Sequence, residues 1–149
     1  MSDKQWDLLL ADDDDDDCHF FEMALGELPI AVRFRSVHNG EQLMQLLTNT
    51  TEPLPDVLFL DLNMPRKSGL ECLVELKGDQ NLNPLPVVVF STYFEPAVAD
   101  LLHKNGAQYC MRKPADFSQL KQLIQQVLTL LASADGLQPA KDGFVLKGT

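Results

Sequence analysis

The stretch Val57–Leu60 constrains the fold of this chain more than any other, because it is entirely apolar and runs directly into Asp61. An uninterrupted run of Val, Leu and Phe of this length is typical of a strand covered on both faces, as in a parallel sheet. Met64 precedes Pro65 and is therefore biased away from helix, so the chain leaves the strand in a loop. Asp61 is thus predicted at the carboxyl end of a buried strand, where open α/β sheets bind their ligands.

The rest of the chain alternates between strand-like and helix-like segments. The segments with the composition and bounds of strands are 6–11, 31–37, 57–60, 87–90 and 107–112. Between them apolar residues recur at helical spacing, as Phe21 and Leu25 do, and either Asp16 or Asp17 would cap that first helix. This alternation predicts an α/β fold, in which a parallel sheet carries helices on both faces.

The length of 149 residues is enough for one domain with a sizeable core. We expect that domain over residues 1–134, without a second domain or an internal repeat. Residues 135–149 contain glycine and proline and are predicted to be a C-terminal tail, which docks through Phe144, Val145 and Leu146.

Composition excludes several classes of protein. A net charge of −10 argues against nucleic-acid binding and suits a divalent cation or a basic partner. The three cysteines, Cys18, Cys72 and Cys110, are too widely spaced for a zinc site and odd in number, so we expect a reducing compartment. The N-terminus lacks a secretory signal, and no apolar segment approaches the roughly 20 residues of a membrane helix. The prediction is a cytoplasmic protein that binds neither membrane nor nucleic acid.

Polar side chains follow four of the predicted strands at the point where each ends. They are Asp12 and Asp13, Asp61, Ser91 and Thr92, and Lys113. In a parallel sheet these ends lie along one edge. Carboxylate oxygens hold hard cations such as Mg²⁺, and a lysine ammonium pairs with phosphate oxygens. The set therefore suits phosphoryl transfer, which mainly needs positioning and charge neutralisation, although Asp61 taken alone could equally cap a helix.

Several features occur together in a fixed order. They are the strand ending in Asp12-Asp13, the Leu60–Pro65 segment with Gly69 after it, Ser91-Thr92, and Lys113-Pro114. Each is weak alone, but in this order the chain resembles the receiver domain of two-component response regulators, from about Asp7 to Ala132. The resemblance implies a flavodoxin-like (βα)5 fold, with a doubly wound five-stranded parallel sheet of order 2-1-3-4-5, and a stand-alone receiver.

The resemblance also implies the chemistry of the acidic residues. Asp61 would be the phosphoacceptor, taking a phosphoryl group from a phosphohistidine of a sensor histidine kinase. Mg²⁺ would be the cofactor, bound by Asp12, Asp13 and Asp61 and by the backbone carbonyl of Asn63.

The remaining roles belong to residues that follow the fourth and fifth strands. Ser91 and Thr92 would sense the phosphoryl group, and Lys113 would pair with one of its oxygens. The bond from Lys113 to Pro114 would be cis, and Tyr93 would flank the approach of hydrolytic water.

One position departs from the family pattern. A tyrosine or phenylalanine usually stands three residues before the lysine as a switch residue, but Cys110 stands there and Tyr109 is one step earlier. Side chains alternate between the faces of a strand, so Tyr109 should not replace the missing aromatic.

These roles would make the chain a phosphorylation-dependent signalling switch of a phosphorelay rather than a conventional enzyme. Its partners would be a sensor histidine kinase, hybrid or not, a phosphotransfer protein, or a second copy in a homodimer. One alternative is a degenerate receiver that acts only as an interaction module. Another is a phosphatase with an aspartyl nucleophile, which would need a second acid where Asn63 stands.

Asp14 to Asp17 are predicted to form a solvated loop.

Overall fold

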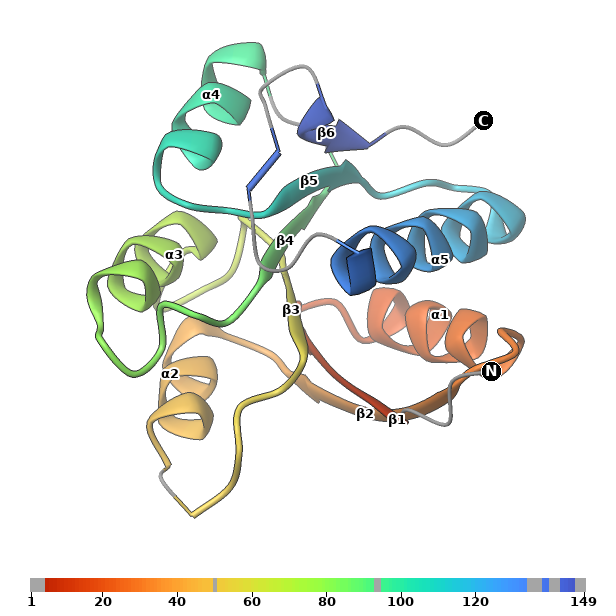
Figure 1. Cartoon of the computed structure of the whole chain (residues 1–149), viewed down its shortest axis with the longest axis horizontal. Helices are drawn as coiled ribbons and strands as arrows, with labels where there is room; N and C mark the ends of the chain where they lie inside the picture. The colour runs from red at the N-terminus through yellow and green to blue at the C-terminus, as the bar shows by residue number, and fades with distance from the viewer. Residues whose placement is uncertain (1–4, 50, 93–94, 134–137, 140–142, 147–149) are drawn as a thin grey trace.

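The fold is a parallel α/β sandwich, seen in a computed structural model that describes residues 5–49, 51–92, 95–133, 138–139 and 143–146 (Figure 1). The strands are β1 Gln5–Ala11, β2 Ala31–Val37, β3 Val57–Leu60, β4 Val87–Ser91, β5 Tyr109–Arg112 and β6 Val145–Leu146. The helices are α1 Asp15–Gly26, α2 Gly40–Thr48, α3 Gly69–Gly78, α4 Pro96–Lys104 and α5 Phe117–Ser133. The strand order is β2-β1-β3-β4-β5-β6 with every pair parallel, which confirms the predicted doubly wound sheet.

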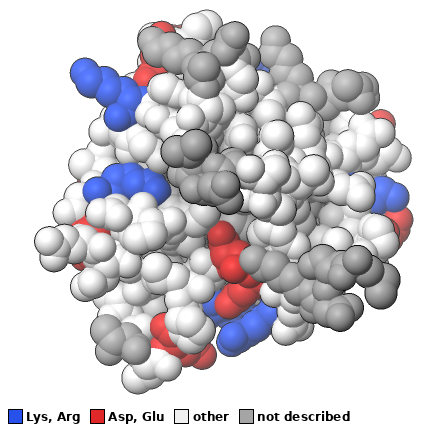
Figure 2. All heavy atoms as spheres, in the orientation of Figure 1, with Lys and Arg blue, Asp and Glu red and all other residues white. Residues whose placement is uncertain are grey.

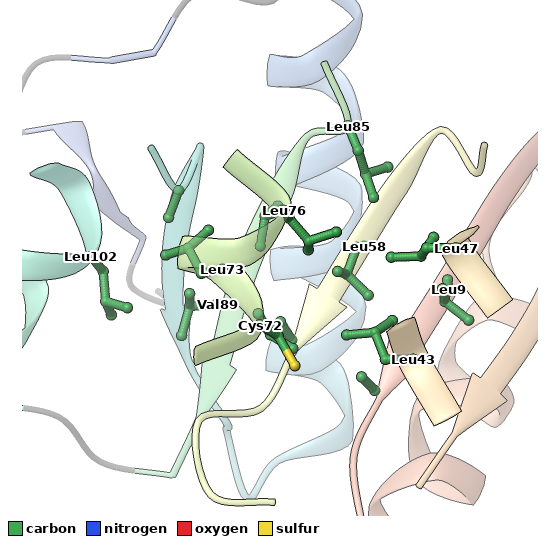
Figure 3. Packing of buried hydrophobic residues seen from close by; sticks show 14 of the residues in the cluster. Leu9, Leu43, Leu47, Leu58, Cys72, Leu73, Leu76, Leu85, Val89 and Leu102 are labelled. Carbon is green, nitrogen blue, oxygen red and sulfur yellow. The ribbon is translucent and has the colours of Figure 1, made fainter. Parts of the chain in front are cut away.

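The sheet separates two apolar cores. Helices α1 and α5 cover one face, and α2, α3 and α4 cover the other (Figure 1). Because side chains alternate along each strand, Leu9 and Leu58 belong to the core beneath α2 and α3, whereas Leu8 and Phe59 belong to the core beneath α1 and α5. Figure 3 shows leucines of the first core, among them Leu43 and Leu76, gathered between helices and strands. Burial on both faces explains why the central strands are continuously apolar.

Strand β6 is the main addition to the predicted fold. It pairs with β5, and Cys110 donates its backbone N–H to the Phe144 carbonyl at 3.0 Å. The side chain of Phe144 is buried, and its ring lies edge-on to that of His103 in α4. A strand of two residues is too short to show any periodicity, so the sequence predicted five strands.

Among the element boundaries that differ from the predictions, those of α1 and β5 differ for reasons that the hydrogen bonds show. Helix α1 begins at Asp15, and its cap is Asp14, whose side chain accepts the N–H groups of Asp16 and Asp17 at 2.9 and 3.2 Å. The predicted caps were therefore wrong, since both residues are already inside the helix. Strand β5 begins two residues later than predicted, because the Ala107 N–H bonds to the carbonyl of Leu102 in α4.

Among the helices that the structure describes, none is both long enough and apolar enough to cross a membrane. On the face drawn in Figure 2, lysine and arginine side chains lie apart from one another, with acidic side chains among them.

Candidate functional site

The site forms where the sheet's hydrogen bonds continue one residue past the strands. Asp61 donates its N–H to the Ala11 carbonyl at 2.9 Å, and Lys113 donates to the Ser91 carbonyl at 2.8 Å. Asp12 donates likewise to the carbonyl of Val37 at 3.0 Å. These backbone bonds bring the polar residues that follow separate strands to one edge of the sheet, as the sequence predicted.

Three carboxylates converge at this edge. Each of Asp12, Asp13 and Asp61 offers an oxygen, and these atoms lie within 4.8 Å of one another. Asp13 is exposed, whereas Asp12 is fully buried and Asp61 is 4% exposed. Asp12 Oδ1 accepts the Asp14 N–H at 3.0 Å, and its buried Oδ2 faces the ammonium of Lys113. Converging carboxylate oxygens are hard donors that fit a divalent cation, so the triad is a candidate metal site.

Lys113 is the cation of the site. Its Nζ lies 2.7 Å from Asp12 Oδ2, 2.8 Å from Asp17 Oδ2 and 3.5 Å from Asp61 Oδ2. Burial alone would lower the pKa of this ammonium, but its hydrogen bonds to Asp12 and Asp17 outweigh that effect and raise the pKa above its usual value. Lys113 therefore stays charged at any physiological pH.

Burial has the opposite sign for the carboxyl groups. It raises the pKa of Asp61 to about 6, although the charge of Lys113 opposes the shift. It also raises the pKa of Asp12 against the same opposition from Lys113. The site thus holds more negative charge than one lysine neutralises, and an additional cation would lower the free energy of both ionised carboxylates.

A folded-back loop fixes Asp61. Asn63 donates its N–H to Asp61 Oδ1 at 3.3 Å, and Gly69 donates to the Leu62 carbonyl at 3.0 Å. A Cβ at Gly69 would lie 2.2 Å from the Asp61 carbonyl oxygen, so only glycine allows this approach. Arg66 takes a positive φ of 68° to complete the turn.

The predicted sensing residues lie at the same edge. Ser91 is fully buried at the end of β4, and Thr92 after it is exposed. Tyr93 lies outside the described residues. No cis peptide bond occurs among the described residues, so the expectation of a cis bond before Pro114 was wrong.

The atypical switch position is buried in the core. Cys110 packs in the cluster that contains Leu102 and Phe144, and Tyr109 packs in the other cluster, as strand alternation requires. Burial raises the pKa of the Cys110 thiol to about 12. Tyr109 therefore does not stand in for the missing aromatic, and Cys110 is a packing residue without thiolate character.

Asp17 is the site residue that sequence reasoning missed. The sequence predicts a solvated loop from Asp14 to Asp17, but Asp17 lies in the first turn of α1 and contacts Lys113. A usable signal existed, because Asp17 stands four residues before Phe21 and therefore shares the inward face of the helix. The run of six aspartates obscured that spacing.

The fold and the site together define a doubly wound α/β protein with an acidic, lysine-containing centre at the carboxyl ends of its strands. Residues 8–125 match the response regulator receiver domain, so the chain belongs to that family. Receiver domains are signalling modules that generally work with histidine kinases.

Individual relatives agree with the family. The chain is 33% identical over 89 residues to response regulator Rcp1 of Synechocystis sp., an alignment that covers 57% of this chain and 60% of that protein. It is 28% identical over 135 residues to the transcriptional regulatory protein ZraR of Escherichia coli, covering 90% of this chain but 29% of that protein. The chain thus spans less than two thirds of the length of these relatives.

Solved structures share the fold over most of the chain. The phosphorylated cyanobacterial phytochrome response regulator RcpA superposes with a TM-score of 0.79 at 27% identity, covering 88% of this chain and 96% of that one. The Mn²⁺-bound form of Rcp1 gives a TM-score of 0.77 at 24% identity, covering 91% of this chain and 99% of that one. At that identity the second likeness supports the fold alone.

Proposed function

We propose that this chain is a phosphorylation-dependent switch of two-component signalling, with Asp61 as its phosphoacceptor. The observation that carries the proposal is the position of the Asp61 carboxylate. It lies 3.5 Å from Lys113 Nζ and within 4.8 Å of the oxygens of Asp12 and Asp13, at the edge where such sheets bind ligands. The donor would be a phosphohistidine of a sensor histidine kinase or of a phosphotransfer protein.

Each site residue takes a role in this proposal. An oxygen of Asp61 attacks the phosphorus of the donor, the new O–P bond forms, and the P–N bond breaks as its electron pair returns to the histidine ring. Asp12, Asp13, Asp61 and the carbonyl of Asn63 would hold Mg²⁺. The ion would supply charge neutralisation between the nucleophile and the phosphoryl oxygens. Lys113 pairs with a phosphoryl oxygen, and Ser91 and Thr92 offer hydroxyl groups to it.

The switch then acts through a change of population. A phosphoryl group adds about −1.5 to −2 charges to the site. That charge stabilises whichever arrangement of the β3 and β4 loops and of α4 places more donors around it, and a protein partner reads the difference. The chain's own chemistry is confined to accepting and losing that group, so we do not propose a substrate-turnover enzyme. Residues 1–134 would be the receiver and 135–149 a C-terminal segment, in a cytoplasmic protein.

The two alternatives fare unequally. A phosphatase with an aspartyl nucleophile would need an acid two residues after Asp61, and the amide of Asn63 cannot donate a proton to a leaving group. A degenerate receiver remains the rival, because Cys110 replaces the usual aromatic residue. The presence of all the acidic residues and of Lys113 argues against it.

The decisive experiment is intact-mass measurement after incubation with acetyl phosphate and Mg²⁺. We expect one added phosphoryl group on the wild type, dependent on Mg²⁺ and absent from Asp61→Asn, while the exposed control Asp16→Asn keeps it. If no adduct forms, beryllium fluoride titrations read by NMR would detect a site that hydrolyses its phosphoryl group quickly. A wild type that responds to neither reagent would make the interaction module the better assignment.

A further inference from the structure

The contact between Asp17 and Lys113 has no place in the roles given above, although it is among the shortest in the site. Lys113 Nζ lies 2.8 Å from Asp17 Oδ2 but 3.5 Å from Asp61 Oδ2. Charge-assisted hydrogen bonds of this type are about 2.7–2.9 Å long. The lysine is therefore hydrogen-bonded to Asp17, and it lies farther from Asp61, at the longer distance of a loose ion pair.

The start of helix α1 fixes the position of Asp17. The Asp14 cap accepts the Asp17 N–H at 3.2 Å and sets the first turn of the helix beside Lys113. Asp17 does not belong to the triad whose oxygens converge on a common point, which is the only such group in the described part of the chain. Asp17 thus pairs with the lysine, whereas Asp12 both pairs with the lysine and belongs to the triad.

We propose that Asp17 is a positioning residue that holds the Lys113 ammonium off the Asp61 carboxylate, so that Asp61 stays open to the metal ion and the phosphoryl donor. An ammonium has three donors on a flexible stem. With Asp17 present, the two short contacts are to Asp12 and Asp17. Without Asp17 the ammonium is no longer held toward α1 and moves closer to Asp61, the next carboxylate within reach, and the tighter ion pair competes with the metal ion for the same oxygens.

This inference rests on the proposed function and adds a division of labour to it. The ammonium waits at a distance of 3.5 Å from Asp61, and it pairs with a phosphoryl oxygen once that group is bound. In a reaction with acetyl phosphate, the Asp61 oxygen forms the new bond to phosphorus, and the bond from phosphorus to the acetate oxygen breaks, so that acetate leaves with the electron pair. Asp17 takes no part in bond making.

Two measurements on the full chain test the role, with matched variants. Asp17→Asn and Asp16→Asn each remove one charge from the same acidic turn. Of these two aspartates, Asp17 is the one that contacts Lys113. By calorimetry without phosphodonor, we expect Asp17→Asn to bind Mg²⁺ about tenfold more weakly, the factor typical of one redistributed charged hydrogen bond. Asp16→Asn should stay within about twofold of the wild type, and Asp17→Glu should recover part of the loss.

The second measurement follows acetyl phosphate labelling against Mg²⁺ concentration. Asp17→Asn should raise the Mg²⁺ concentration at half-maximal rate by the same factor and leave the rate at saturating Mg²⁺ within about twofold, because competition is overcome by excess ion. A role limited to holding the helix would lower the maximal rate instead.

A Lys113→Met background separates the lysine from a direct field effect. If Asp17 acts through Lys113, Asp17→Asn has no effect on Mg²⁺ binding in that background. Equal behaviour of Asp17→Asn and Asp16→Asn, or an undiminished effect without Lys113, would overturn the inference. A wild type that binds Mg²⁺ but responds to neither acetyl phosphate nor beryllium fluoride refutes the phosphoacceptor role instead, since the calorimetric comparison needs no phosphorylation.

Discussion

Two clusters of charged side chains lie toward opposite ends of the parallel strands. The site cluster consists of Asp12, Asp17, Asp61 and Lys113. The edge cluster consists of Asp7 of β1, Arg33 and Arg35 of β2, and Glu52 of the loop before β3. Arg35 contacts Glu52 at 2.9 Å and Asp7 at 3.3 Å, and Arg33 contacts the same two residues at 3.7 and 3.9 Å.

The clusters differ in charge balance and in burial. In the edge cluster two guanidinium groups face two carboxylates, and the side chains of Arg33 and Glu52 are each 49% exposed. In the site cluster one ammonium faces three carboxylates, and Asp12 is fully buried. Water screens the first arrangement more than the second, where the side chains of Lys113 and Asp61 are only 12% and 6% exposed. A buried excess of negative charge is costly for folding, and it marks a place where a divalent cation can bind.

The largest expected effect on stability comes from removing Lys113, the cation of the site cluster. Lys113→Ala leaves buried carboxylates without their partner and should lower the free energy of unfolding by about 3 kcal/mol at pH 7. Because the carboxyl pKa values then rise further above their unfolded values, the loss should grow from pH 4 to pH 7. Urea unfolding at both pH values checks this, with Lys121→Ala as the control. Lys121 pairs with the exposed Glu27 at 3.0 Å, and its removal should cost less than about 1 kcal/mol.

Adding a divalent cation should relieve the same charge imbalance. At a Mg²⁺ concentration one hundred times its Kd, the free energy of unfolding should rise by about 2.7 kcal/mol. Thermal unfolding with and without Mg²⁺ measures the increment. Asp13→Asn should diminish the increment, whereas Asp7→Asn, in the edge cluster, should leave it unchanged. An increment that depends on Asp7 would remove the distinction between the clusters.

Asp61→Asn should stabilise the protein in the absence of Mg²⁺. Burial raises the pKa of Asp61 to about 6 in the folded state, so its ionisation costs stability as pH rises from about 4 through 6. The variant lacks this loss and should gain about 3 kcal/mol at pH 7, with no gain below pH 4. Chemical unfolding from pH 3.5 to 7 follows the difference. A variant that is less stable at pH 7 would contradict the assignment of a raised pKa.

The edge cluster should give the smallest effect. A double-mutant cycle on Arg35 and Glu52 should yield a coupling free energy below about 1 kcal/mol, because Glu52 is half exposed. The coupling should fall further in about 1 M salt, where the Debye length is roughly 3 Å. Urea unfolding of the four proteins at two salt concentrations provides the values.

The sequence was most informative where long apolar runs ended in polar residues. Asp12, Asp61 and Lys113 were predicted at one edge because each follows a strand, and the continued backbone bonds place them there. Asp17 was missed because a homopolymeric run carries no periodicity from which the start of a helix could be read. Strand β6 was missed because two residues are stabilised by tertiary pairing rather than by their own pattern. The contacts of Lys113 with both Asp12 and Asp17 depend on side-chain geometry, which residue spacing in the sequence does not predict.

Strand β6 also bears on how the molecule behaves at high concentration. An unpaired outer strand is a template on which another chain can add, and natural sheets guard against such self-association. At one border of the sheet, the backbone N–H of Cys110 in β5 already donates to the Phe144 carbonyl. Strand β5 therefore offers fewer unpaired backbone groups to a strand of another chain. At the other border β2 carries Arg33 and Arg35, whose charges discourage a second copy from pairing there. One border thus ends in a strand of only two residues and the other carries charged side chains, and both features disfavour association of copies through the sheet borders.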